Sequence, residues 1–364
     1  MKQTLIYISA LIIAVSCIKA PENPANSGFE DSKNGVFVLC EGLLGHDNSS
    51  LVRYEAASGS ITQNFFRNSN TGQYLGDTAN DIVLKGDTAF VVISTPGIIE
   101  IFNITSGNSL GRIILPEGST PRHISIINDS TAYVSDLYDN SITKFNPRNF
   151  EILRARINTG PNPEEIVHFG NFLFIANSSL GAFNQDDPKS RTIAVLDITT
   201  DNVVKHIKSG PNTVELELNE ANNKLYAGYY NIYRQDSLGG IIEYDLSTFE
   251  ETAHWRLHPY NLELSPDGSE LFFFDQPPKG FTSERWKGLC KINLAADDPE
   301  VQKLTENKKE NEYWYSLGIS PANESIWIGN AKNYQIEGEI LEYNNGSLTY
   351  QFKTGINPNN IIFY

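Results

Sequence analysis

Asn140-Ser-Ile-Thr-Lys-Phe-Asn146 carries a short strand pattern, in which an apolar residue is followed three positions later by an aromatic or apolar residue and then by Asn, Asp or Glu. The pattern occurs seven times, at intervals of 43 to 51 residues. Repetition at this period is typical of repeat architectures built from short strands. The copies are Leu51…Tyr54-Glu55, Ile99…Phe102-Asn103, Ile142…Phe145-Asn146, Ile193…Leu196-Asp197, Ile241…Tyr244-Asp245, Leu289…Ile292-Asn293 and Ile340…Tyr343-Asn344.

A second series consists of a polar residue directly before an apolar strand residue, and it also has seven members. Hairpin signals such as Lys85-Gly-Asp87 and Pro266-Asp-Gly268 separate the two series, and a hydrophobic run follows each signal. Each repeat is therefore expected to form four short antiparallel strands. The second series is Asp81-Ile82, His123-Ile124, Glu165-Ile166, Glu215-Leu216, Asn261-Leu262, Ser316-Leu317 and Asn360-Ile361.

Four-stranded units repeated at this period predict an all-β fold, a seven-bladed β-propeller over residues 35–364. The first repeat starts at Gly35 without an innermost strand before it, while the chain ends in the unpaired strand Asn359-Asn-Ile-Ile-Phe-Tyr364. We therefore expect the C-terminal strand to complete blade 1 and close the ring.

Composition excludes several classes of function. The chain has 364 residues and a net charge of −16, so a basic nucleic-acid surface is not expected. It lacks Cys-x-x-Cys-His, Gly-x-Ser-x-Gly, a P-loop and His-Glu-x-x-His, which argues against haem, acyl-hydrolase, nucleotide and zinc-protease sites. Cys40 and Cys290 lie in strand-like runs and are expected to be buried, inert thiols.

The N-terminus is typical of an exported protein. Met1-Lys2 precedes an apolar run, Leu5–Val15, that is too short to span a membrane, and Ala14-Val15-Ser16-Cys17 resembles a bacterial lipobox. We expect residues 1–16 to be a signal peptide, Cys17 to be lipidated, and residues 17–34 to form a flexible linker. This predicts an outer-membrane lipoprotein, surface-exposed or periplasmic; a cleaved signal without lipid is the alternative.

Insertions in blades 4 to 7 supply the first candidate site. They lie between the second and third strands, in 177–188, 228–236, 275–286 and 330–336. Because loops have no core to fill, their aromatic and arginine side chains are candidate ligand contacts, although each aromatic ring also has the alternative of covering a blade edge. The candidates are Phe183, Tyr229, Tyr230, Tyr233, Arg234, Phe281, Arg285, Trp286 and Tyr334, with Arg122 and His123 on the neighbouring blade.

The polar members of the second series supply the other candidate site, near the mouth of the central channel. Asp81, Glu165 and Glu215 are carboxylates there, and Ca²⁺ prefers oxygen ligands, so a bound calcium ion is one hypothesis. A solvated channel lined by polar strand ends is the favoured alternative. Asn261 and Asn360 complete the predicted set at the mouth.

Several segments carry a family resemblance. Thr120-Pro-Arg-His-Ile124, Thr131-Ala-Tyr-Val-Ser-Asp136 and Thr159-Gly-Pro-Asn162 resemble the YVTN-repeat (YncE-like) seven-bladed propellers, across residues 35–364. Blade 1, with Cys40-Glu-Gly-Leu-Leu-Gly-His46, is similar to exported propeller lipoproteins, some of which capture vitamin B12 and pass it to a TonB-dependent transporter. The resemblance implies the fold strongly and the ligand weakly, because the family hosts several functions.

Three functions follow as hypotheses. The leading one is a non-enzymatic, lipid-anchored protein that captures a nutrient or cofactor on one propeller face, with a corrinoid as the candidate that the resemblance implies. The second is a lactonase-like enzyme using Glu164, Glu165 or Glu215 with Arg122 and His123. The third is a platform for protein–protein interactions in the cell envelope.

Overall fold

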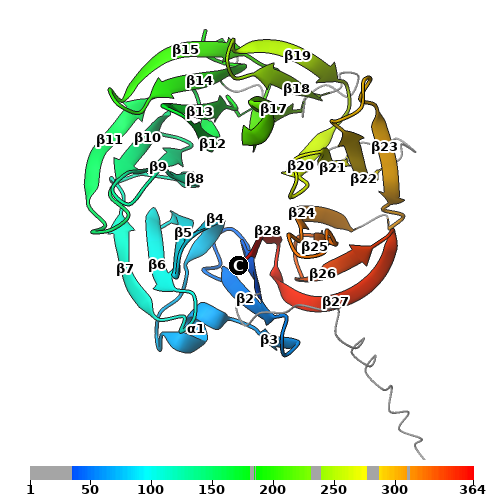
Figure 1. Cartoon of the computed structure of the whole chain (residues 1–364). Helices are drawn as coiled ribbons and strands as arrows, with labels where there is room; N and C mark the ends of the chain where they lie inside the picture. The colour runs from blue at the N-terminus through cyan, green and yellow to red at the C-terminus, as the bar shows by residue number, and fades with distance from the viewer. Residues whose placement is uncertain (1–34, 181–183, 185, 231–238, 277–286, 310–311) are drawn as a thin grey trace, which may run out of the picture.

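Seven antiparallel sheets arranged around a central axis make up the structure. The computed structural model describes residues 35–180, 184, 186–230, 239–276, 287–309 and 312–364 (Figure 1). Each sheet has four strands in sequence order from the axis outwards, apart from blade 1, whose innermost strand comes from the C-terminus. The predicted seven-bladed propeller of four-stranded blades is thus confirmed.

The blades have the following strands. Blade 1 contains β28 (Pro358–Phe363), β1 (Gly35–Cys40), β2 (Ser50–Glu55) and β3 (Ser60–Thr62); blade 2 contains β4 (Asp77–Lys85), β5 (Thr88–Thr95), β6 (Ile98–Asn103) and β7 (Ser109–Ile114). Blade 3 contains β8 (Pro121–Ile126), β9 (Ala132–Asp136), β10 (Ser141–Phe145) and β11 (Ile152–Asn158); blade 4 contains β12 (Pro163–Phe169), β13 (Phe172–Asn177), β14 (Thr192–Asp197) and β15 (Asn202–Lys208). Blade 5 contains β16 (Thr213–Asn219), β17 (Lys224–Tyr229), β18 (Gly240–Asp245) and β19 (Glu250–Trp255); blade 6 contains β20 (Pro259–Leu264), β21 (Glu270–Asp275), β22 (Gly288–Asn293) and β23 (Val301–Glu306). Blade 7 contains β24 (Tyr313–Ile319), β25 (Ile326–Lys332), β26 (Glu337–Asn344) and β27 (Ser347–Ile356); the described helices are α1 (Phe65–Ser69) and the 3-10 helix η1 (Glu220–Asn222).

The two ends of the described chain close the ring. Strand β28 pairs antiparallel with β1, with Val38 opposite Ile361 and Val36 opposite Phe363. The hydroxyl of the last residue, Tyr364, accepts a hydrogen bond from Nε of Arg53 at 2.7 Å. The predicted closure by the C-terminal strand is confirmed, and Figure 1 shows that strand on the inner side of the ring.

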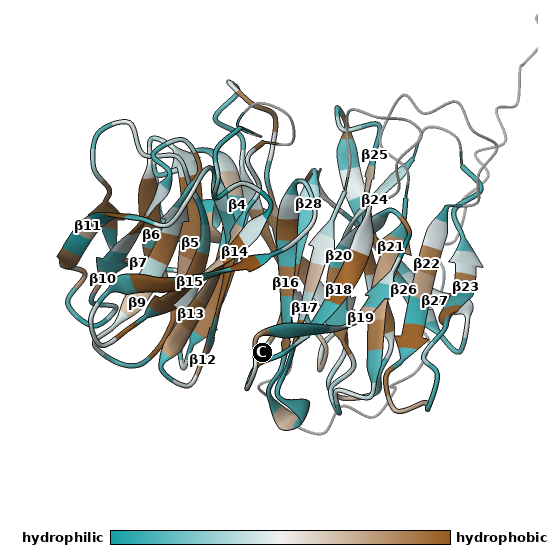
Figure 2. Ribbon diagram, turned by 90° about the horizontal axis from the view of Figure 1, so that it is seen from above, coloured by the Kyte–Doolittle hydropathy of each residue, from teal (hydrophilic) through white to brown (hydrophobic). Residues whose placement is uncertain are grey.

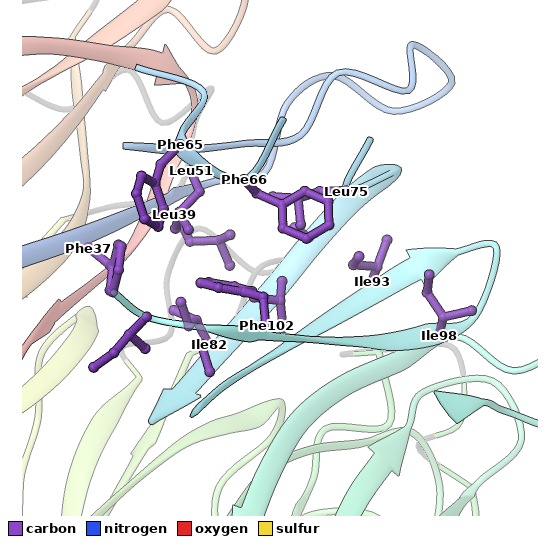
Figure 3. Close-up of a cluster of buried hydrophobic side chains, with 14 residues drawn as sticks. Phe37, Leu39, Leu51, Phe65, Phe66, Leu75, Ile82, Ile93, Ile98 and Phe102 are labelled. Carbon is purple, nitrogen blue, oxygen red and sulfur yellow. The ribbon is translucent and has the colours of Figure 1, made fainter. Parts of the chain in front are cut away.

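Apolar side chains fill the spaces between adjacent blades. The described residues form seven buried hydrophobic clusters, one for each blade–blade interface, because each sheet is too thin to bury both of its faces alone. Figure 2 shows apolar residues along the strands and hydrophilic ones in the turns. Figure 3 shows the cluster between blades 1 and 2, where Phe65 and Phe66 of α1 cover Phe37 and Phe102.

The two cysteines of the described region take part in this packing. Cys40 and Cys290 are both free and buried, as predicted. Burial raises the pKa of each thiol to about 12, so neither forms a thiolate at neutral pH. Within the described ranges, the helices are too short or too polar to cross a membrane.

Candidate functional site

A cavity of about 260 Å³ opens on the propeller axis, and the seven innermost strands line it. Each of these strands carries a register shift, a β-bulge, near its first residues. A bulge breaks the strict alternation of strand side chains, so two consecutive residues of each strand line the cavity. The bulges therefore produce two stacked rings of side chains.

We call these the first ring and the second ring, in the order in which the chain enters each strand. The second ring holds the polar residues singled out in the sequence, and the structure brings all seven to the one cavity. The first ring comes from the residues just before them, which sequence reasoning did not single out as a set. The first ring is Asn80, Arg122, Glu164, Val214, Tyr260, Tyr315 and Asn359; the second is Asp81, His123, Glu165, Glu215, Asn261, Ser316 and Asn360.

Arg122 is held in place within the first ring by partners on both sides. Its Nε donates to Oε2 of Glu164 on blade 4 at 2.8 Å, and its Nη1 donates to Oδ1 of Asn80 on blade 2 at 2.6 Å. Asn80 is fixed in turn by donating to the carbonyl oxygen of Pro121 at 2.7 Å. The guanidinium thus bridges three blades and presents a preorganised planar donor at the cavity.

Tyrosines line the opposite arc of the first ring. The rings of Tyr260 and Tyr315 stack with centroids 6.1 Å apart and planes 22° apart, and Tyr230 lines the same cavity. The hydroxyl of Tyr315 donates to Oε2 of Glu41 at 2.7 Å, and Tyr334 packs edge-on against Tyr315 at 5.4 Å. Burial raises the pKa values of Tyr260 and Tyr315, so both stay neutral hydrogen-bonding phenols.

The carboxylates of the second ring tie neighbouring blades together. Oδ2 of Asp81 accepts from the backbone N–H of Ile124 at 2.9 Å, and Oε2 of Glu165 accepts from that of Leu216 at 3.1 Å. One layer deeper, Oε1 of Glu217 accepts from the N–H of Leu264 at 3.1 Å. In each case the acceptor belongs to one blade and the donor to the next, so these groups have a structural task.

Carboxyl groups are the commonest ionisable groups of the cavity lining. Seven carboxyl groups line the cavity, against one guanidinium among the described lining residues. Burial raises the pKa of Asp81 to about 6 and that of Glu217 to about 7, and it also raises the pKa values of Glu41, Glu165, Glu215 and Glu263. Burial and the nearby Arg122 lower the pKa of His123 to about 3, so this imidazole is neutral. The carboxyl groups are Glu41, Asp81, Glu164, Glu165, Glu215, Glu217 and Glu263.

The calcium hypothesis gains no support from this geometry. Among the described residues, no group of three or more His, Cys, Asp or Glu side chains is placed to hold a metal ion. Asp81, Glu165 and Glu215 come from blades 2, 4 and 5, and an oxygen of each of the first two is already bonded to a backbone N–H.

The residues that were predicted as ligand contacts in the loops fall into three groups according to where the structure places them. Tyr230 lines the cavity, and Tyr334 is half-buried beside Tyr315. Tyr229 is a correction: it is 2% exposed within the core of blades 4 and 5, because strand β17 includes Gly228 and Tyr229 from the predicted insertion 228–236. The hydroxyl of Tyr229 bonds with Nε2 of His254 at 2.8 Å. The residues outside the described ranges are Phe183, Tyr233, Arg234, Phe281, Arg285, Trp286 and Cys17, the predicted site of lipidation.

The cavity and the described strand ends that flank these loops share one face of the propeller. Neighbouring strands are antiparallel, so each second strand ends, and each third strand starts, at the end of the blade where the innermost strand begins. The first ring belongs to that end. We call this side the entrance face.

Comparisons with known proteins agree on the fold. Residues 34–249 match the family described as "Domain of unknown function (DUF5074)". No curated protein matches the chain. The chain is similar to the periplasmic gluconolactonase PpgL of Pseudomonas aeruginosa, at 11% identity and a TM-score of 0.63, over 91% of this chain and 98% of that one.

Two further solved structures are similar. A quinonprotein alcohol dehydrogenase-like protein from Bacteroides thetaiotaomicron has 11% identity and a TM-score of 0.66, over 91% of this chain and 78% of that one. Kuenenia stuttgartiensis hydrazine synthase has 14% identity and a TM-score of 0.65, over 81% and 98%. At such identities the similarity demonstrates a shared propeller fold and leaves the activity to be argued from the site.

Proposed function

The chain belongs to the DUF5074 family, and from the first ring of its channel we propose that it is a non-enzymatic binding protein that captures a small molecule on the entrance face. One observation carries the proposal: the stacked pair Tyr260 and Tyr315 lines the same cavity as a guanidinium, Arg122, that is already fixed by Glu164 and Asn80. Rigid aromatics and a preorganised arginine are the groups that dominate binding energy at recognition sites.

The first ring suits an amphipathic ligand. Tyrosine rings offer apolar faces, while the tyrosine hydroxyls and Arg122 offer hydrogen bonds. A corrinoid combines an apolar ring system with many amide groups, and it is the candidate implied by the resemblance of blade 1 to surface lipoproteins. We propose that a lipid on Cys17 holds the propeller at the outer membrane and that a TonB-dependent transporter receives the ligand.

Replacing Tyr260 or Tyr315 by alanine is expected to weaken cyanocobalamin binding at least about thirtyfold, equal to about 2 kcal/mol, because each removes one half of the stacked platform. Isothermal titration calorimetry of the purified protein measures this. Tyr260→Phe keeps the ring and should stay within a few-fold of the parent. Leu348→Ala, 48% exposed on the outer strand β27, is the matched control. Unchanged affinity in both alanine variants would place the ligand elsewhere.

A lactonase is the competing function, favoured by the buried carboxyls Glu165 and Glu215 and by the similarity to a gluconolactonase. Burial and the nearby Glu215 raise the pKa of Glu165 well above its ordinary value. Because Oε2 of Glu165 already accepts the N–H of Leu216, we assign it a structural role. We expect gluconolactone hydrolysis to equal the buffer blank at every pH from 5 to 9. A bell-shaped rate profile that disappears in Glu165→Gln would establish the enzyme instead.

A further inference from the structure

We propose that a second cavity, at the rim where blades 1 and 7 meet, binds a neutral saccharide. This cavity measures about 460 Å³, which exceeds the volume of the channel cavity and falls within the range of about 300–1,000 Å³ common for ligand pockets. Its lining comes from the β1–β2 and β3–β4 connections of the entrance face and from strand β27. The inference is independent of the proposed function, because the two cavities share none of their lining residues.

One wall of this rim cavity is the segment between β3 and β4, which buried side chains attach to blades 1 and 2. Phe65 and Phe66 of α1 are buried against blades 1 and 2, as Figure 3 shows, with the rings of Phe66 and Phe102 5.7 Å apart. Asn70 is 9% exposed and donates to the carbonyl oxygens of Phe66 and Gly107 at 2.8 and 2.7 Å, while its Oδ1 accepts from the N–H of Ser109 at 2.8 Å. The segment is therefore held rigidly while its polar side remains open.

The guanidinium of Arg67 stacks over the ring of Tyr74 on that open side. The guanidinium carbon of Arg67 lies 4.3 Å from the centroid of the Tyr74 ring, and its Nη2 donates to the Tyr74 hydroxyl at 3.1 Å. Tyr74 is nevertheless 47% exposed. A tyrosine fixed in orientation and left exposed presents an apolar ring face together with planar donors, which matches the C–H face and the hydroxyl edge of a sugar ring.

The opposite wall comes from blade 7. Glu337 begins β26 and Lys353 lies in β27, and both line the cavity. Nε2 of Gln63 on blade 1 donates to the backbone carbonyl oxygen of Lys353 at 2.7 Å, which joins the two walls. A ligand in this cavity would thus touch two blades whose relative position is fixed.

The charged residues that line the rim cavity indicate which class of ligand it binds. Arg67 and Lys353 are matched by Asp47 and Glu337, so the lining has no net charge and offers donors and acceptors together. This disfavours polyanions, which also meet a chain of net charge −16, and it disfavours simple cations. The mixture of Asn, Gln, Ser and Thr with the four charged groups disfavours a purely apolar ligand. A neutral polyhydroxylated molecule satisfies both donors and acceptors without unpaired charge.

The test is a microarray of neutral and anionic oligosaccharides probed with the purified protein, followed by calorimetry on the best-bound neutral glycan. We expect neutral glycans to bind. Tyr74→Ala should lose tenfold or more in affinity and Tyr74→Phe less than threefold, while Tyr138→Ala, an exposed tyrosine of blade 3, should match the parent. Because Tyr74 is exposed, thermal melts of these variants should coincide with that of the parent.

Three results would overturn the inference: no neutral glycan bound, binding of anionic glycans alone, or neutral-glycan affinity that Tyr74→Ala leaves unchanged. Tyr260→Ala separates this inference from the proposed function, since it should weaken cyanocobalamin binding and leave glycan binding intact. Failure of one site would then leave the result at the other unaffected.

Discussion

Arg122→Ala is expected to destabilise the folded protein by about 3 kcal/mol at pH 8, because it leaves buried carboxylates without their cation. Glu164 loses a 2.8 Å ion pair, and Asn80 loses a 2.6 Å hydrogen bond. Arg122 also lowers the pKa values of Asp81 and Glu41, so its removal should raise both. We place the loss at the lower end of the range for buried pairs, since the Arg122 side chain is 29% exposed. Urea unfolding at pH 8 measures the change.

A double variant separates lost charge balance from lost packing. Arg122→Met with Glu164→Gln keeps side chains of similar volume and removes one charge of each sign, so it should recover more than half of the loss. A single variant as stable as the parent at pH 8 would contradict the arrangement of the first ring. So would a double variant that is no better than Arg122→Ala.

The stability of the propeller is expected to fall as pH rises from 5.5 to 8. Burial raises the pKa of Asp81 to about 6 and that of Glu217 to about 7, so the folded chain binds more protons than the unfolded chain across this window. Stability is then fully present at low pH and is lost as pH rises through these raised values. Asp81, shifted from 3.8 to about 6, accounts for about 1 kcal/mol of the difference between pH 5.5 and 8, because most of its effect is already lost below pH 5.5.

His123 opposes this trend at lower pH. Its pKa is lowered to about 3 by burial and Arg122, so the unfolded chain binds the extra proton below about pH 6.5. Above about pH 4.5 the two carboxyls outweigh this single imidazole, so these three groups place the most stable state near pH 4. Urea midpoints measured from pH 3.5 to 8.5 locate this maximum.

Glu217→Gln tests whether ionisation of the buried channel carboxyls causes the fall in stability with rising pH. Glutamine keeps an oxygen that accepts the N–H of Leu264 but has no charge to desolvate. The gain in stability of the variant over the parent should be about 2 kcal/mol larger at pH 8 than at pH 5.5. A variant that is destabilised at pH 8, or a parent whose stability rises with pH, would show that the channel carboxyls do not carry raised pKa values.

The fold was predictable because its signals are periodic and local. The pattern around Ile142–Asn146 and the polar–apolar pairs such as Glu165-Ile166 each occur seven times, and the orphan strand at Asn359–Tyr364 indicated the closure with Gly35 that the structure contains. Such agreement between strand pattern and turn chemistry is what specifies a repeat fold.

The candidate site was only half predictable. The second ring follows from the repeat, but Tyr260 and Tyr315 precede it by one residue and would face away in a regular strand. Only the bulge brings both rings to the channel, and a bulge leaves little trace in one sequence. A repeat-by-repeat alignment would have offered one signal, since the position before each second-ring residue is polar or aromatic in every blade except at Val214.

Loop aromatics were the least predictable element. Tyr229 and Tyr230 are adjacent, yet the first ends a strand inside the core and the second lines the cavity, because strand ends shift by a residue or two with tertiary packing. The rim cavity gave no repeat signal either, since the segment from Gln63 to Leu75 occurs only in blade 1.

The most direct test of ligand capture is a crystal structure of the protein with cyanocobalamin, recorded at a wavelength where cobalt scatters anomalously. Our account predicts one cobalt peak over the entrance of the channel, with the corrin ring in contact with Tyr260 and Tyr315. A peak at another place on the propeller, or crystals grown with the ligand that contain none, would contradict it.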